Sequence, residues 1–194
     1  MVKVWIDHVI YATADLDAAA ARLETEHGLK ASGGGRHEGI GTHNRVIPLG
    51  GGYLELLAIA DAEEAAASGI GQAVAARVEA GEGLMGWAVA VADVSAEAER
   101  VGEPVSAIGR EGMTARLAGV GRAMAEPCLP FFIERDPGVP DPGAEGDAGG
   151  IRWVEVTGDA TRIGDWLGPA DLPVRVSSGE PALRGVGIGD FELR

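Results

Sequence analysis

Residues 6–19 read IDHVIYATADLDAA, and this stretch decides the architecture of the chain. Its first half belongs to an apolar, β-branched segment, residues 2–12, which predicts a buried strand. Asp15 then stands where a helix N-cap is expected, and apolar residues follow at helical spacing up to Gly28, a residue type that commonly ends helices. The stretch therefore predicts a strand that is followed directly by a helix.

Three more strands are predicted in the next part of the chain. A glycine-rich segment with a weak strand near Arg36 precedes two apolar strands, residues 42–49 and 53–59. Three glycines at 50–52 join these two strands, and glycine tolerates the positive φ that a tight hairpin needs. Residues 1–60 therefore read as one β-α-β-β-β module.

The same order of elements returns further along the chain. Residues 61–83 are predicted as a helical connector, and residues 84–135 again read β-α-β-β-β. The segment 8–15 matches the segment 86–93 at an offset of 78 residues. An internal repeat of this kind indicates a duplicated structural unit.

The last third of the chain divides into two parts. Residues 136–150 are rich in proline, glycine and acidic residues without periodicity, which predicts a linker or an exposed loop. Residues 151–194 read strand, helix and short strands, and are interpreted as a partial third β-α-β-β module.

Paired β-α-β-β-β modules with a histidine in the first strand and a glutamate in the fourth resemble the vicinal oxygen chelate superfamily. The segments IDHVIYATADLDAA, GTHNRVIPLGGGYLELLAI and LPFFIERD resemble its glyoxalase-like branch in particular. The resemblance covers roughly residues 3–190 and implies an α+β fold. In that fold, tandem βαβββ modules of mixed sheet curve into a half-barrel cleft, here with a third partial module. It also implies a divalent metal (Zn, Ni, Mn, Co or Fe) that chelates neighbouring substrate oxygens and acts as a Lewis acid.

The resemblance places three candidate metal ligands on this sequence. His8 and Glu55 match the ligand positions of the first module, and Glu134, which ends the second module, matches Glu55 at an offset of 79. A metal ion, or a hydrogen-bonded pair between His8 and Glu55, would explain two polar residues among apolar strand neighbours. Glu134 could instead form an ion pair at the surface. A carboxylate left free, Glu134 or Glu55, would act as the catalytic base.

The fourth ligand of the family pattern is missing from the second module. Gly86 and Trp87 stand where a histidine or glutamate is expected, and neither can ligate a metal. An extradiol dioxygenase needs two histidines and one carboxylate for Fe(II), so that activity is disfavoured, and a glyoxalase I activity is questionable for the same reason.

Five residues are candidates for substrate binding. His43, Asn44 and Arg45 begin a strand, and because side chains alternate, one polar set faces either the cleft or solvent. Trp87 and Phe132 could wall an apolar pocket, or could simply fill the core. His37, in the glycine-rich segment, is interpreted as either a lid residue or an exposed one.

Composition limits the remaining possibilities. The 194 residues carry a formal net charge of −14 and the basic residues do not cluster, which argues against binding to nucleic acid or to a membrane surface. A single cysteine allows no internal disulfide, and no long apolar run predicts a membrane helix or a signal peptide. A cytoplasmic protein with a small-molecule ligand, which could form a homodimer, is therefore expected.

Two functions from different classes follow from these observations. The first is a metal-dependent isomerase, lyase or related enzyme that polarises vicinal oxygens of a small metabolite in the cleft. The second is a non-catalytic protein that binds or sequesters a small molecule, as bleomycin-resistance proteins do.

Overall fold

The computed structural model describes residues 4–110, 113–136 and 138–194, and its first module has the predicted elements. Asp15 accepts hydrogen bonds from the backbone of Asp17 and Ala18 and so caps the helix, and Gly28 ends it with a φ of 71°. The module consists of β1 (Trp5–Ala12), α1 (Leu16–His27), β2 (Ser32–His37), β3 (Thr42–Pro48) and β4 (Tyr53–Ile59).

The connector and the second module also follow the prediction, with one additional helix. The connector forms α2 (Ala62–Ala67) and α3 (Gly69–Glu79), and the module consists of β5 (Gly83–Ala90), α4 (Val94–Val101), β6 (Val105–Arg110), β7 (Met113–Ala118), α5 (Val120–Ala125) and β8 (Phe131–Arg135). The sequence analysis missed α5, because this six-residue helix begins at Gly119 without a side-chain cap that would signal it.

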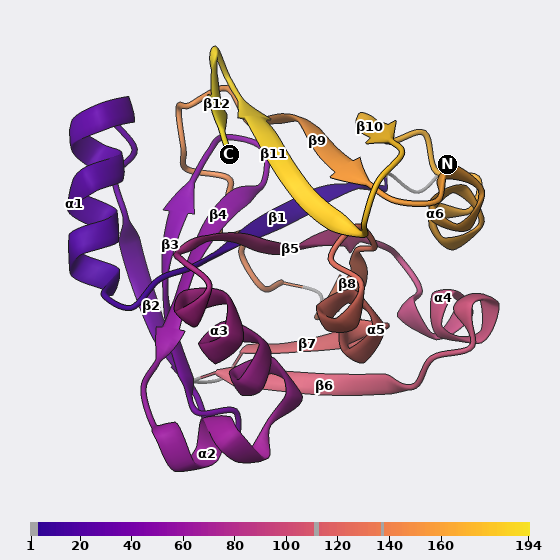
Figure 1. Cartoon of the computed structure of the whole chain (residues 1–194), viewed down its shortest axis with the longest axis horizontal. Coiled ribbons are helices and arrows are strands. Elements are labelled where there is room, and N and C mark those ends of the chain that lie inside the picture. The colour runs from indigo at the N-terminus through magenta and orange to yellow at the C-terminus, as the bar shows by residue number, and fades with distance from the viewer. Residues whose placement is uncertain (1–3, 111–112, 137) are drawn as a thin grey trace.

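The two modules join into one eight-stranded sheet with the order β2-β3-β4-β1-β5-β8-β7-β6. The first strand of each module pairs in parallel with the last strand of the same module, and β1 pairs antiparallel with β5 across the join. The two edge strands, β2 and β6, approach each other, so the sheet curls into a half-barrel (Figure 1). The predicted fold class is therefore confirmed.

The C-terminal segment forms a second, four-stranded sheet with the order β10-β9-β11-β12. Its elements are β9 (Ile151–Thr157), α6 (Ala160–Leu167), β10 (Val174–Ser177), β11 (Ala182–Ile188) and β12 (Phe191–Leu193). The element order is the predicted one, but β9 pairs in parallel with the very next strand, β10, rather than with the last. The segment thus repeats the element order of a module with a different strand pairing.

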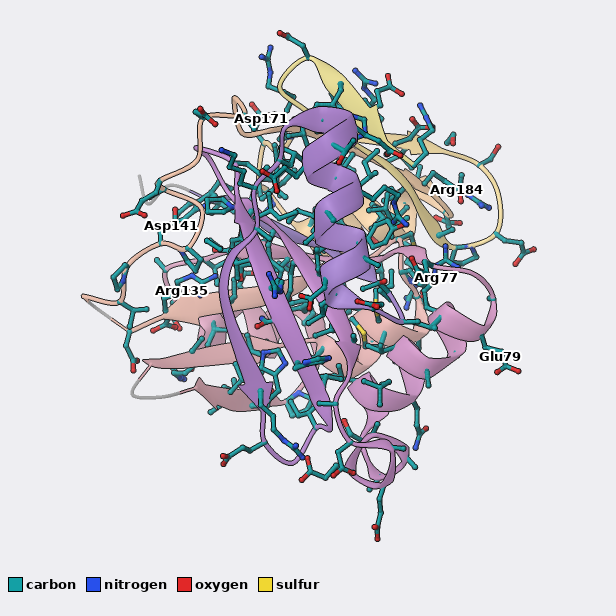
Figure 2. The ribbon with its side chains drawn as sticks, turned by 90° about the vertical axis from the view of Figure 1, so that its left-hand side faces the viewer. Arg77, Glu79, Arg135, Asp141, Asp171 and Arg184 are labelled. Atoms are coloured by element: carbon teal, nitrogen blue, oxygen red, sulfur yellow. The ribbon has the colours of Figure 1, made fainter. Side chains whose placement is uncertain are left out.

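Apolar residues pack on both faces of the large sheet. The outer face carries the larger core, in which Leu23 of α1 and Trp87 of β5 share one buried cluster with Val154 and Ile188 of the second sheet. Helix α1 lies along the outer face of β3 and β4 (Figure 2). A smaller cluster on the inner face includes Val74 of α3. The inner face is therefore only partly filled, and a cavity lies there.

The segment 136–150, predicted as a linker or loop, packs against the β3–β4 turn. The backbone N–H of Gly50 donates to the carbonyl of Gly143 over 2.8 Å, and that of Gly150 donates to Leu49 over 2.7 Å. The segment is mostly exposed, yet these bonds tie it to the first module. No helix in the part of the chain that the structure describes is long and apolar enough to cross a membrane.

Gly34 in β2 has a backbone that only glycine fits without strain. Its φ is +135°, and a Cβ atom there would lie 2.0 Å from the carbonyl oxygen of Asn44. We expect Gly34→Ala to lower the free energy of unfolding by about 2–3 kcal/mol, measured by urea denaturation. Gly33→Ala is the matched control, because Gly33 also has a positive φ (46°) but no atom within 4 Å of the Cβ position. Equal losses from both variants would contradict the close contact at Gly34.

Glu126, which follows α5, links the second module to α6. Arg162 donates to both of its carboxylate oxygens, over 2.6 and 2.7 Å, and these bonds hold the pKa of Glu126 below its usual value. A lowered pKa in the folded state adds stability above the unfolded pKa, and this stability is lost as the pH falls through the folded pKa. Glu126→Gln should therefore cost up to about 1 kcal/mol near neutral pH and nothing in acid, whereas the exposed Glu24→Gln should show no such dependence.

Candidate functional site

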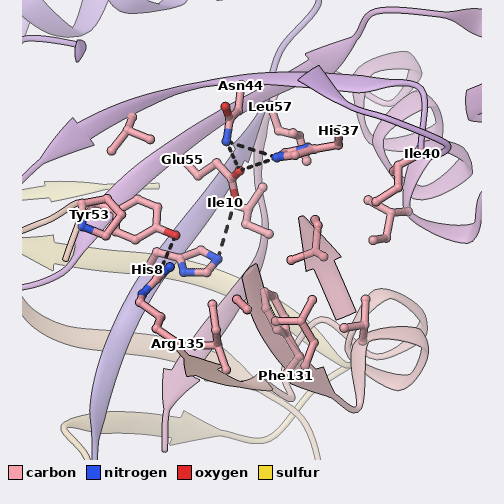
Figure 3. Close-up of a pocket in the computed structure, with 18 of the residues that line it drawn as sticks. His8, Ile10, His37, Ile40, Asn44, Tyr53, Glu55, Leu57, Phe131 and Arg135 are labelled. Carbon is pink, nitrogen blue, oxygen red and sulfur yellow. Dashed lines mark hydrogen bonds and ion pairs between the residues drawn. The ribbon is translucent and has the colours of Figure 1, made fainter. Parts of the chain in front are cut away.

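A half-open cavity of about 150 Å³ lies on the inner face of the curled sheet (Figure 3). Polar side chains from the first module line one wall, and apolar side chains from the second module line the other. A volume near 150 Å³ accommodates a molecule about the size of benzene. The lining residues used below are His8, Ile10, His37, Asn44, Tyr53, Glu55, Leu57, Ala115, Leu117, Phe131, Ile133 and Arg135.

A β-bulge in β1 brings two neighbouring polar side chains together. The pairing of β1 with β5 shifts register between Ile6 and His8, so Asp7, the residue between them, has no paired partner in β5. Asp7 and His8 are both buried, and His8 Nδ1 lies 2.6 Å from Asp7 Oδ1. With Nδ1 bound to the carboxylate, Nε2 is the ring nitrogen that faces Glu55, 3.7 Å from its Oε2. The His8 ring also stacks on Tyr53, with centroids 4.6 Å apart.

Glu55 is held by polar groups although it is only 8% exposed. Asn44 Nδ2 donates to Glu55 Oε1 over 2.5 Å, and His37 Nε2 lies 3.9 Å from the same oxygen. The backbone N–H of Gly35 donates to Asn44 Oδ1 over 2.9 Å, which fixes the amide so that its NH₂ group faces Glu55. Glu55 therefore has a defined position, with Oε2 on the side of His8.

Arg135 and Tyr53 form a second polar group in the cavity. Arg135 Nη2 lies 2.5 Å from Asp7 Oδ1 and 3.1 Å from the Tyr53 hydroxyl, to which it donates. Burial raises the pKa of Asp7, but His8 and Arg135 together outweigh it, so the pKa of Asp7 lies below its usual value. Burial and the charges of Asp7 and Glu55 raise the pKa of Tyr53 well above its usual value, so the hydroxyl keeps its proton and can donate it.

The opposite wall offers only apolar surface at the matching positions. Ala115 and Leu117 of β7 and Phe131 and Ile133 of β8 face the cavity. Ile133 is the cavity-facing residue of β8 at the level where Glu55 lies in β4. A ligand bound here would contact acid, base and hydroxyl groups on one side and hydrocarbon on the other.

Glu134, predicted as a metal ligand and as a possible base, lies on the other face of β8. Its Oε2 accepts a hydrogen bond from the backbone of Val94 over 2.8 Å, at the start of α4, and lies 3.3 Å from Arg116 Nη1. Side chains alternate along a strand, and Phe131, Ile133 and Arg135 occupy the cavity face. The structure therefore brings His8 and Glu55 together but not Glu134, which matches the surface ion-pair alternative.

Trp87 and Phe132, predicted as pocket walls, belong to the outer core instead. Trp87 is 0% exposed, and Phe132 packs beside Trp166 of α6 with centroids 6.2 Å apart. Both residues lie in the cluster shared with the second sheet rather than around the cavity. The alternative interpretation, core packing, describes them.

The three predicted residues at the start of β3 separate between the two faces of the sheet. Asn44 lines the cavity, whereas His43 and Arg45 lie with Asp17 along an outer groove, and Arg45 forms an ion pair with Asp17. Of the three, only Asn44 is placed to touch a ligand in the cavity.

Sequence reasoning missed Arg135 and Tyr53 as site residues and left His37 between a lid and an exposed position. His37 is the last residue of β2 and faces Glu55. Two signals could have found them. Tyr53 shares its strand face with Glu55, and Arg135 is two residues beyond Ile133. The carboxylate that holds Arg135 comes from the bulge at Asp7, which the sequence does not announce.

The donor set does not fit the metal centre that the resemblance implies. Catalytic zinc sites use three protein ligands, and in the described residues no three His, Cys, Asp or Glu side chains are placed to hold one ion. His8 and Glu55 supply two donors, the opposite wall is apolar, and the charged residue from the second module is a cation, Arg135. The chemistry open to this site therefore rests on its own side chains.

Comparisons with known proteins agree with this fold. A hypothetical protein from Staphylococcus aureus superposes with a TM-score of 0.66 at 16% identity, over 93% of this chain and 88% of that chain. Methylmalonyl-CoA epimerase from Streptomyces coelicolor, in complex with 2-nitronate-propionyl-CoA, gives a TM-score of 0.53 at 23% identity, over 66% of this chain and 95% of that chain. The Mycobacterium tuberculosis methylmalonyl-CoA epimerase gives 0.50 at 19% identity, over 69% and 87%.

The family follows from a sequence comparison. No curated protein matches the chain. The model of the glyoxalase-like domain family matches residues 6–162, well over half of the chain. Because this match includes both modules that build the cavity, the chain belongs to the glyoxalase-like domain family, within the vicinal oxygen chelate superfamily.

Proposed function

We propose that the cavity binds a small carbonyl compound and that Glu55 removes a proton from the carbon next to the carbonyl, as in an isomerase or lyase step. The observation that carries this proposal is the placement of Glu55, a buried carboxylate that is hydrogen-bonded on Oε1 by Asn44 and open to the cavity and His8 on the Oε2 side. A general base must be both positioned and within reach of the proton it removes.

The neighbouring groups support the same chemistry. When the carbon–hydrogen bond breaks, its electron pair moves onto the carbonyl oxygen and the proton forms an O–H bond on Glu55. The Tyr53 hydroxyl, which accepts from Arg135, can donate to the negative oxygen that develops. His8, 3.7 Å from Glu55, can share the proton before it returns to the same or a neighbouring carbon. The enolate-forming step is redox-neutral.

The fold comparisons are compatible with this reaction class but do not assign it. The similar structures include methylmalonyl-CoA epimerases, and an epimerase inverts a stereocentre. Function has to be argued from the site itself, because one fold carries many activities. In this chain the two donors His8 and Glu55 are too few for a resident metal, so the proposed step uses none.

Hydrogen–deuterium exchange tests the proposal directly. Branched-chain keto acids, short ketones and short acyl thioesters would be incubated with the protein in deuterium oxide and followed by proton NMR. We expect at least one class to exchange the proton beside its carbonyl faster than in buffer, at a rate unchanged by prior dialysis against a chelator.

The other outcomes each overturn a stated part. Exchange that a chelator abolishes and a divalent ion restores would replace the proposed step with a metal-dependent one. Binding without exchange in every class would favour the second candidate, a non-catalytic binding protein, for which the apolar wall of the second module is the favouring observation.

A further inference from the structure

Arg135 is a cation placed inside an acidic protein. The chain carries a net charge of −14, and among the described residues that line the cavity Arg135 is the only lysine or arginine. Its side chain is 21% exposed, and Figure 2 shows it within the outline of the sheet, whereas Glu79 and Arg184 lie at the periphery. A partly buried cation needs a compensating partner, and Asp7 is that partner.

The contacts of Arg135 leave donors over. A guanidinium has five N–H donors. Nη2 makes both recorded bonds, to Asp7 and to Tyr53, whereas Nε is buried without a hydrogen-bond partner among the residues described. Unpaired buried donors are rare in proteins and call for an explanation. A ligand oxygen beside the guanidinium would supply the missing acceptor.

The cavity separates this cation from the proposed base. Figure 3 shows Tyr53 and Arg135 on one side of His8, and Asn44 and His37 around Glu55 on the other. A ligand can therefore place one polar group at Arg135 while another part of it lies at Glu55. The apolar residues of β7 and β8 along the opposite wall fit a hydrocarbon body between the two ends.

We infer that Arg135 determines specificity for a carboxylate, so the substrates of this site are short carboxylic acids with an apolar, branched body. The carboxylate accepts from the guanidinium and from the Tyr53 hydroxyl, and Asp7 holds the guanidinium in place. This inference rests on the proposed function only in assuming that the cavity binds a small molecule. It adds the charge and the orientation of that molecule.

Isovalerate and isovaleramide are the probes that test it, because they have the same shape and differ in charge. Titration calorimetry on the full-length protein should show isovalerate binding at least about tenfold more tightly than isovaleramide, as expected for a charge-assisted bond over a neutral one. In wild-type protein, the Nε–H NMR signal of Arg135 should shift with isovalerate and not with isovaleramide.

Variants separate the guanidinium from general effects of folding. Arg135→Lys keeps the charge that Asp7 needs and should reduce the preference. Arg135→Met combined with Asp7→Asn removes both charges and should abolish it. Arg152→Met, at an exposed position, should change nothing. Circular dichroism confirms folding in each case.

Three results would overturn the inference. Equal affinity for the two probes, or a preference that survives in the double variant, would show that Arg135 does not read the charge while leaving the proposed base intact. Failure of wild-type protein to bind either probe would reject both the inference and a small-acid ligand for the cavity. Glu55→Gln should keep the preference, so a loss of proton exchange in that variant reports on the proposed function alone.

Discussion

Glu55→Gln is expected to lower the rate of catalysed proton exchange by at least about a hundredfold, the contribution of a positioned general base. Glutamine has nearly the same shape, and its amide oxygen can still accept the hydrogen bond that Asn44 donates to Glu55 Oε1. It cannot accept a proton from carbon. The measurement is the rate of deuterium incorporation by NMR at saturating substrate, with substrate affinity determined separately.

Glu134→Gln is the matched control for this experiment. Glu134 is the carboxylate that the sequence aligns with Glu55, but it lies on the outer face of β8, where it accepts from the backbone of Val94. Glutamine can accept the same bond, so exchange should continue at the wild-type rate. A large loss of exchange in Glu134→Gln, with Glu55→Gln fully active, would move the proposed base to the second module.

The fold could be predicted from the sequence because its signals are local and occur twice. Asp15 and Asp93 each precede a helix and each cap it, and Gly28 and Gly102 each end one in the left-handed conformation. Cap residues act within a few positions, so their effect can be read without knowing the rest of the structure. The duplicated order then determines which strands pair.

The misplacement of Glu134 has a specific physical origin. The helix-cap segments repeat at 78 residues, whereas Glu55 and Glu134 are 79 apart. Side chains on a strand alternate with a period of two, so a shift by one residue moves a side chain to the other face. The register confirms this, because Phe131 and Ile133 of β8 face the cavity as Tyr53 and Glu55 of β4 do.

The group around Arg135 could not be predicted, because it depends on a break in the alternation of β1. Regular alternation would put Ile6 on the face of His8 and Ile10 and put Asp7 on the other. The bulge instead places Ile6 in the outer core, while Asp7 contacts both His8 and Arg135. Arg135 is 128 residues from Asp7, and no local pattern links the two.

Asp7→Ala is expected to lower the free energy of unfolding by about 3–5 kcal/mol, the usual cost of removing one partner from a buried ion pair. Asp7 is 1% exposed and contacts both His8 Nδ1 and Arg135 Nη2. Its removal leaves the Arg135 charge in the protein with only the Tyr53 hydroxyl beside it. Guanidinium denaturation at neutral pH measures the loss.

A double-mutant cycle shows whether that cost comes from the unpaired charge. If it does, Asp7→Ala combined with Arg135→Met should be less destabilised than the sum of the two single variants, because residues in direct contact are not additive. Asp17→Ala is the matched control, since Asp17 pairs with Arg45 at the surface and should cost no more than about 1 kcal/mol. Additive losses at Asp7 and Arg135 would mean that the two charges do not stabilise each other. Asp7 would then be needed chiefly to orient His8, and the guanidinium would lack the anchor that its proposed role at the carboxylate requires.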